Sequence, residues 1–186
     1  FWIWLTSLFF REEATNPTAE RFSFDFGAIS PAYTDALQSL RRAWAEIGKS
    51  PEPKLAFETW RNYLAVTYGS VGTDSEELTT LFLKHTYLAS VARILVWAAL
   101  SSGKTSGSFG VIANEILSGE YFRTKGIDNL VEDDFFQWVR SRKAADILSP
   151  IWERIIAQMR TYDLGRIGQD VLKGVYQELV DPKDRH

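Results

Sequence analysis

One long segment, residues 74–100, constrains the fold of this chain more than any other feature. Thr73 with Glu76 three positions later forms a capping box, a pattern that predicts the start of a helix. Apolar side chains then cover most of the circumference of that helix, so we expect it to be buried at the centre of a bundle. One apolar stripe consists of Leu78, Leu81, His85, Leu88, Ala92, Leu95 and Ala99. The polar exceptions form one narrow strip of Thr86, Ser90 and Arg93.

Further helices are predicted on both sides of the central one. Ser30 and Pro31 provide an N-cap and a first-turn proline for a helix that stops at Gly48. The helical period resumes after Pro51 and Pro53. Downstream, the pattern favours a short helix ending near Gly119, one from Glu132 to Lys143, one around Ile151 to Met159 and one from Ile167 to Leu179. Only residues 21–26 (RFSFDF) have the alternation of a short strand. The sequence therefore predicts an all-α fold, an irregular multi-helix bundle.

Length and composition bear on the organisation of the domain. At 186 residues, the chain is long enough for one domain. We interpret residues 1–186 as a single helical domain with one candidate hinge at residues 101–110, which are rich in Gly and Ser. The single methionine is Met159, so we expect the chain to be a fragment of a longer protein. The apolar run from Tyr87 to Leu100 is shorter than the roughly 20 residues that cross a bilayer, and we expect no membrane contact.

The composition also argues against several kinds of site. The chain has no cysteine and two histidines, which excludes thiolate ligands and makes a metal site unexpected. His85 lies on the apolar stripe, so we expect a hydrogen-bonded core histidine rather than a base or ligand. The absence of cysteine suits a cytoplasmic location. A net charge of -3 argues against binding nucleic acid through a broadly cationic surface.

A local basic group remains after these exclusions. Arg140, Arg142 and Lys143 lie close together in the sequence, with Arg123 and Lys125 as candidate neighbours. Lysine and arginine side chains are the usual contacts to a phosphate backbone, so these five residues are the predicted DNA-binding residues. The alternative is that they only end a helix that begins at the acidic residues Glu132 to Asp134, where each charge would offset the helix dipole.

Three stretches of the chain share a further pattern. Leu81 to Ala92 reads LFLKHTYLASVA, Ile116 to Val139 reads ILSGEYFRTKGIDNLVEDDFFQWV, and Tyr162 to His186 reads YDLGRIGQDVLKGVYQELVDPKDRH. Together they resemble the helical region that precedes the catalytic domain in adenine-specific DNA methyltransferases of restriction-modification systems, enzymes that methylate the exocyclic amino nitrogen. The resemblance covers about 110 residues from Glu77 onward.

The resemblance implies a function for a parent protein rather than for this chain alone. The family's Asn-Pro-Pro-aromatic loop holds a flipped adenine, and a glycine-rich loop holds S-adenosylmethionine. This chain contains neither motif, so we expect no catalytic, cofactor-binding or metal-binding residue in it. In this interpretation the chain is a non-catalytic N-terminal or connector domain. It would meet DNA through the parent enzyme, which would also supply the S-adenosylmethionine site.

The partner implied by the resemblance is the catalytic methyltransferase domain of the same parent chain. The amphipathic stripe of the terminal helix would supply docking residues, namely Ile167, Val171, Val175 and Tyr176. The same stripe could equally pack within the bundle, because an amphipathic pattern does not identify its partner. The alternative function is a free-standing helical adaptor that binds another protein.

Overall fold

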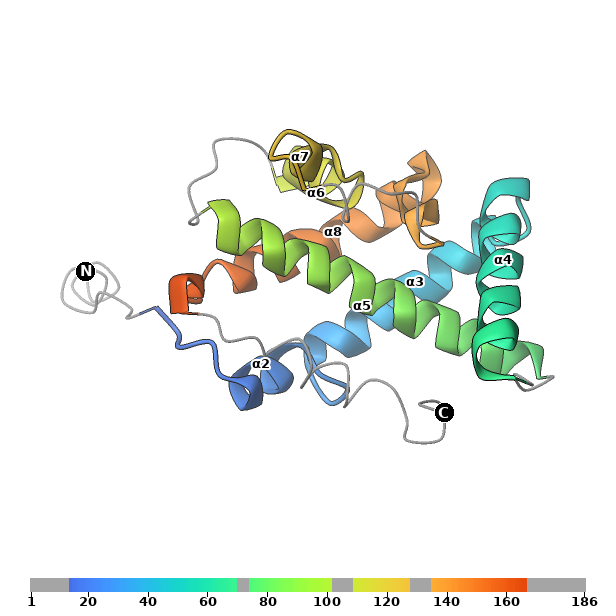
Figure 1. Ribbon diagram of the computed structural model, residues 1–186, viewed down its shortest axis with the longest axis horizontal. Helices are drawn as coiled ribbons and strands as arrows, with labels where there is room; N and C mark the ends of the chain where they lie inside the picture. Colours follow the sequence, from blue (N-terminus) through green and yellow to red (C-terminus); the bar gives the residue numbers. More distant parts are fainter. Residues whose placement is uncertain (1–13, 70–73, 102–108, 128–134, 167–186) are drawn as a thin grey trace, which may run out of the picture.

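The fold is known from a computed structural model, which describes residues 14–69, 74–101, 109–127 and 135–166 (Figure 1). In these ranges the regular elements are helices, and the only extended pairing is a single parallel bridge between Thr15 and Tyr162. The prediction of an all-α multi-helix fold is confirmed. The α-helices are α2 (Ala19–Phe26), α3 (Pro31–Ile47), α4 (Pro51–Tyr68), α5 (Ser75–Ser101), α6 (Phe109–Leu117), α7 (Glu120–Arg123) and α8 (Arg142–Met159). Two short 3₁₀ helices are η2 (Gln137–Arg140) and η3 (Leu164–Arg166).

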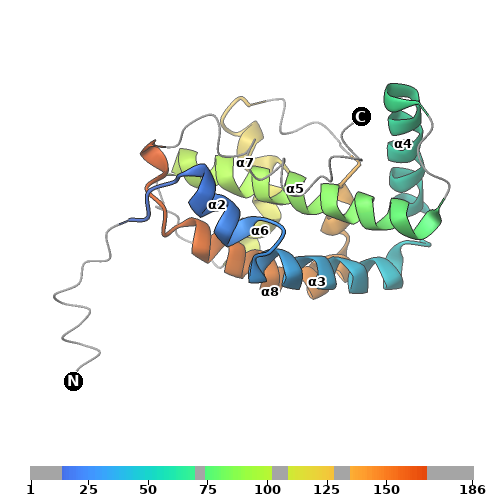
Figure 2. The ribbon, with the colours of Figure 1, turned by 90° about the horizontal axis from the view of Figure 1, so that it is seen from below.

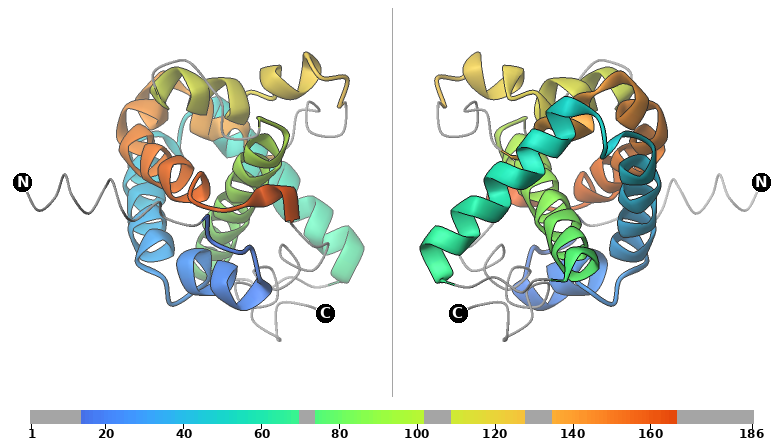
Figure 3. Two further views of the ribbon diagram at one scale, coloured as in Figure 1. Left: turned by 90° about the vertical axis from the view of Figure 1, so that its left-hand side faces the viewer. Right: turned by 90° about the vertical axis from the view of Figure 1, so that its right-hand side faces the viewer.

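The bundle is arranged around α5, as predicted for residues 74–100. Helices α3 and α8 pack against each other and both pack on α5 (Figures 1 and 2). Helix α6 covers α5 and α8, while α4 crosses the end of the bundle and touches α5 and η2 (Figure 3). None of the described helices combines the length and apolar character needed to span a membrane. Most of the predicted hinge, residues 102–108, lies outside the described ranges.

The narrow polar strip of α5 lies in the interior of the bundle. Thr86, Ser90 and Arg93 are all buried, whereas Leu81 and Leu88 of the apolar stripe are half-buried. The hydroxyls of Thr86 and Ser90 donate to the carbonyls of the residues four positions earlier, at 2.9 and 2.8 Å. Because the helix itself satisfies these hydroxyls, burying them costs little.

Aromatic rings fill the core where α3, α4, α5 and η2 meet. Phe82 of α5 is fully buried, and five aromatic rings have their centroids between 5.1 and 6.3 Å from its own. Trp138 also donates from its indole N–H to Thr86 Oγ1 at 3.3 Å. Aromatic pairs at such separations contribute beyond the area that they bury. The rings around Phe82 are Trp44, Phe57, Trp60, Phe136 and Trp138.

The hydrogen bonds at the N-termini of the helices can be compared with the predicted N-caps. The Ser30 hydroxyl accepts from the Tyr33 amide at 3.0 Å, which confirms the predicted cap of α3. For α5 the cap is Asp74, whose carboxylate accepts from the Glu76 amide at 2.7 Å. The predicted cap, Thr73, lies outside the described residues. Helix α4 starts at Pro51 itself, because a proline in the first turn gives up no helical hydrogen bond.

Residues 21–26 form part of helix α2, so the suggested strand was wrong. Thr18 caps this helix by accepting from the Arg21 amide at 3.2 Å. Phe22 and Phe26, four residues apart, share its buried face, whereas Phe24 is 62% exposed. The alternating phenylalanines misled the prediction because a spacing of four suits both a strand face and a helix face.

A polar contact joins the start and the end of the described chain. Asp25 is buried in α2 and accepts from the Tyr162 hydroxyl and, at 3.1 Å, from Arg21 Nε. Beside it, the Thr15 amide donates to the Thr161 carbonyl at 2.8 Å, and the Asp163 amide donates to the Thr15 carbonyl at 2.9 Å. These bonds hold residues 14–26 against the end of α8.

The buried Tyr87 makes the free energy of unfolding vary with pH in the alkaline range. Its hydroxyl is buried and donates to the Phe26 carbonyl at 2.8 Å. Burial raises the pKa of Tyr87 well above its ordinary value, so the folded state keeps a proton that unfolded tyrosine loses above pH about 10. The stabilisation is therefore complete below pH 10 and should fall by about 1.4 kcal/mol per pH unit above it. Burial also raises the pKa values of Tyr33, Tyr121 and Tyr162, so urea unfolding at a series of pH values measures a combined slope. Tyr87→Phe should reduce that slope by about 1.4 kcal/mol per pH unit. An equal slope in the variant would contradict the assignment.

Candidate functional site

The basic residues predicted to contact DNA lie at the junction of two helices. Arg140 is the last residue of η2, and Arg142 and Lys143 form the first turn of α8. Ser141 separates them with extended backbone, and its hydroxyl accepts from the Ala144 amide at 3.4 Å. The prediction that these cations close a helix was wrong, because the backbone turns at Ser141 and a new helix begins. Glu132, Asp133 and Asp134 lie outside the described residues.

This placement changes the local electrostatics. The N-terminus of a helix carries partial positive charge, so cations there add to the potential instead of offsetting it. Arg140, Arg142 and Lys143 are all exposed. In the described part of the chain, none of them forms an ion pair with a carboxylate. The start of α8 is therefore a local centre of positive potential on a protein with a net negative charge.

The other two predicted cations belong to a different element. Arg123 ends α7 and forms an ion pair with Glu120 of the same helix. The Lys125 ammonium lies 5.9 Å from the centre of the Tyr121 ring. Helix α6 packs on both α7 and η2 and so lies between the two groups of cations. The five predicted residues thus form two groups, and Arg123 is the one among them that is paired with a carboxylate in the described part of the chain.

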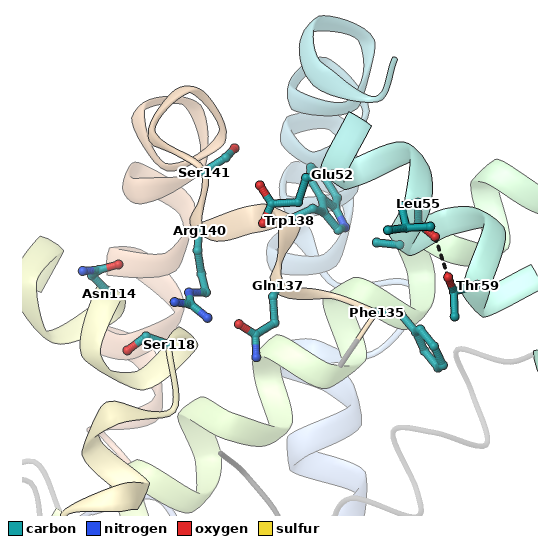
Figure 4. A pocket seen from close by; sticks show the side chains of 11 residues that line it. Glu52, Leu55, Thr59, Asn114, Ser118, Phe135, Gln137, Trp138, Arg140 and Ser141 are labelled. Atoms are coloured by element: carbon teal, nitrogen blue, oxygen red, sulfur yellow. Dashed lines mark hydrogen bonds between the residues drawn. The ribbon is translucent and has the colours of Figure 1, made fainter. Parts of the chain in front are cut away.

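A surface cleft opens beside Arg140. It has a volume of about 780 Å³ and lies between α4, α6 and the segment 135–141 (Figure 4). Arg140 extends toward the wall that carries Asn114 of α6 and Ser118, which directly follows that helix. Glu52 belongs to α4, on the opposite wall. The lining residues are Glu52, Leu55, Ala56, Thr59, Asn114, Ser118, Phe135, Gln137, Trp138, Arg140 and Ser141.

The cleft combines a cation, amides and apolar surface. Arg140 supplies the positive charge, while Asn114 and Gln137 supply side-chain amides that can both donate and accept. Leu55, which is 65% exposed, and the half-buried Phe135 ring supply apolar surface. The Phe135 ring lies 5.8 Å from that of Tyr63, which holds it against α4. Such a mixture suits a ligand with an anionic group and an apolar or planar part.

Among these lining residues, only Arg140 was predicted from the sequence as a site residue. Asn114, Gln137, Phe135 and Glu52 were not predicted as site residues, because they come from three separate segments. They meet only because α4 turns across the end of α5, where Trp60 donates from its indole N–H to His85 Nδ1 at 3.3 Å. This bond confirms the predicted hydrogen-bonded role of His85, although the side chain is half-buried instead of fully buried.

Two further predictions concern the docking residues and the metal site. The docking residues Ile167, Val171, Val175 and Tyr176 lie outside the described residues. Within residues 14–69, 74–101, 109–127 and 135–166, no three carboxylate or imidazole side chains gather as a metal site would require.

Comparison with known proteins adds no relative. No protein-family model matches the chain, and no curated protein or solved structure is significantly similar to it.

Proposed function

We propose that the chain is a non-catalytic helical domain of a cytoplasmic, S-adenosylmethionine-dependent DNA adenine methyltransferase, or of a combined restriction-modification enzyme. Its role is to position the catalytic domain of the same protein. One observation carries the proposal beyond the resemblance itself: two of the stretches that bear the resemblance pack directly against each other in the core.

The contact involves residues 81–92 of α5 and residues 116–139, which run from α6 to η2. The Phe82 and Phe136 rings have centroids 5.7 Å apart. The Trp138 indole N–H donates to Thr86 Oγ1 at 3.3 Å, and both residues are buried. Packed core positions are strongly constrained in size and shape. In a family with a common helical framework, packed positions of this kind are where we expect sequence similarity to be retained.

The third stretch begins at another structural contact. Tyr162 donates to the buried Asp25, and its ring lies 5.7 Å from that of Phe22. The start of this stretch is therefore anchored to α2.

We expect S-adenosylmethionine binding and methyl transfer in the parent protein and not in this chain alone. The 186-residue chain alone should show no binding of S-adenosylmethionine in a calorimetric titration. The whole parent should bind the cofactor and transfer tritiated methyl groups to the exocyclic nitrogen of adenine in DNA. Clear cofactor binding by the isolated chain would contradict the non-catalytic assignment. A parent sequence without a glycine-rich cofactor loop and an Asn-Pro-Pro-aromatic motif would contradict the family assignment.

A second candidate role is direct contact with duplex DNA. The observation that favours it is the exposed cluster of Arg140, Arg142 and Lys143 at the N-terminus of α8. Helix N-termini and exposed cations are both common contacts to phosphates. In this role the chain would hold DNA beside the catalytic domain, and its affinity for duplex DNA should fall steeply as salt is added.

A further inference from the structure

We infer that the cleft between α4, α6 and residues 135–141 binds one unpaired nucleotide of a DNA strand, with the neighbouring phosphates of that strand along the start of α8. This inference rests on the proposed contact with DNA and specifies the form of DNA that the site accepts.

The cations in and beside the cleft favour a ligand with several anionic groups. Arg140 lies in the cleft, and Arg142 and Lys143 follow Ser141, which lines the same cleft. A single small anion in the cleft would meet Arg140, which is the one of these three cations that lines it. A strand with successive phosphates can place one at Arg140 and others at the first turn of α8, where the helix dipole adds to the attraction. The charges therefore favour a polyanion over an isolated anion.

The walls of the cleft offer groups that suit both the face and the edge of a base. Leu55 and the Phe135 ring give the cleft an apolar surface against which a base can lie, as in proteins that bind single strands. Asn114 and Gln137 carry donors and acceptors of the kind that recognise base edges. The carboxylate of Glu52 can accept from an exocyclic amino group, and it repels phosphate from the α4 wall toward Arg140.

The volume of the cleft suits a single base. A cleft of about 780 Å³ lies within the range of pockets for small organic ligands, roughly 300–1,000 Å³. A base pair within a duplex cannot enter such a cleft, because both bases stay stacked and joined to the partner strand. A base reaches a pocket only when it is unpaired or rotated out of the helix. The site therefore fits a nucleotide of a single strand, a bulge or a mismatch.

Fluorescence anisotropy with four labelled probes tests the inference on the 186-residue chain. The probes are a single strand, its duplex, the duplex with one unpaired base, and an abasic strand with the same number of phosphates. We expect the base-bearing single strand and the bulged duplex to bind about tenfold or more tightly than the perfect duplex and the abasic strand. Competition with adenosine monophosphate and with inorganic phosphate separates a free nucleotide from a strand, and a strand should compete far better than either.

Substitutions identify the surface. Phe135→Ala should weaken binding of the base-bearing single strand about tenfold and leave binding of the abasic strand unchanged, while Phe135→Trp should restore affinity. Arg140→Ala should weaken binding of all four probes. Arg41→Ala removes an equal charge from an exposed position on α3 and should change binding little. Urea unfolding of each variant shows that the fold persists.

Three outcomes would overturn the inference. Equal affinity for the perfect duplex and the single strand would remove the requirement for an unpaired base. An equal effect of Phe135→Ala on base-bearing and abasic strands would place the base elsewhere, and in both cases the proposed contact with duplex DNA would stand. Failure to bind any probe would overturn both the nucleotide site and the DNA contact, whereas the scaffold role would still be decided by the methyl-transfer assay.

Discussion

Phe82→Ala should lower the free energy of unfolding by about 3–5 kcal/mol, the usual cost of removing a large aromatic side chain from a packed core. This is a large share of the roughly 5–15 kcal/mol that stabilises a domain. The cost is expected to be high because Phe82 is fully buried and contacts rings from α3, α4 and the segment 136–138. These rings are attached to separate elements, so the cavity cannot close without moving the helices. Urea unfolding followed by tryptophan fluorescence and circular dichroism measures the change.

The matched control is the same substitution at Phe24. This side chain is 62% exposed on α2, and its described contact is with the Arg21 guanidinium, 5.3 Å from the ring centre. Phe24→Ala should therefore cost less than about 1 kcal/mol. If the two variants proved equally stable, Phe82 could not be the centre of the aromatic cluster. If Phe82→Ala failed to fold, Phe82→Leu should give a measurable, smaller loss, because it retains most of the apolar volume.

Replacing Arg140, Arg142 and Lys143 together with alanine should reduce the salt dependence of duplex DNA binding by about three units of slope. Each phosphate contact releases condensed counterions, so each lost contact removes about 0.9 from the slope of log K against log salt for B-DNA. At low salt the affinity should fall tenfold or more, and the loss should shrink as salt rises. Anisotropy titrations at several salt concentrations provide both quantities.

A second triple variant separates local contact from overall charge. Arg41, Arg42 and Lys49 are exposed on or just after α3, and changing them to alanine alters the net charge equally. This control should keep the wild-type slope to within about one unit. The Arg140, Arg142 and Lys143 variant should also be at least as stable as the wild type, because it removes cations from the positive end of α8. Equal slopes in the two variants would show that the start of α8 does not contact phosphates.

The parts of the fold that depend on local chemistry could be predicted from the sequence. Ser30 and Pro31 determine where α3 begins, because the hydroxyl cap and the restricted proline backbone act within a few residues. The length and apolar character of residues 74–100 determine that α5 is central. Neither inference needs knowledge of a distant segment.

The side of a segment that packs against a distant part of the chain was harder to predict from the sequence. Thr86 and Ser90 belong to the polar strip of α5, yet their hydroxyls are satisfied within the helix and they face the core. Alternating phenylalanines suggested a strand at residues 21–26, yet Tyr162 packs on Phe22 and Phe26 and favours a helix. In both places a contact from far along the chain decides between two local patterns that are equally allowed.

The sequence by itself determined the all-α class, the buried centre and the presence of a basic group at residues 140–143. Only the tertiary structure decided that this group begins α8 and that a cleft adjoins Arg140. The reason is physical. Helix formation and burial follow from the period of apolar residues within one segment. A cleft such as that between Glu52, Asn114 and Phe135 depends instead on the angles at which three separate segments pack, and no local pattern encodes those angles.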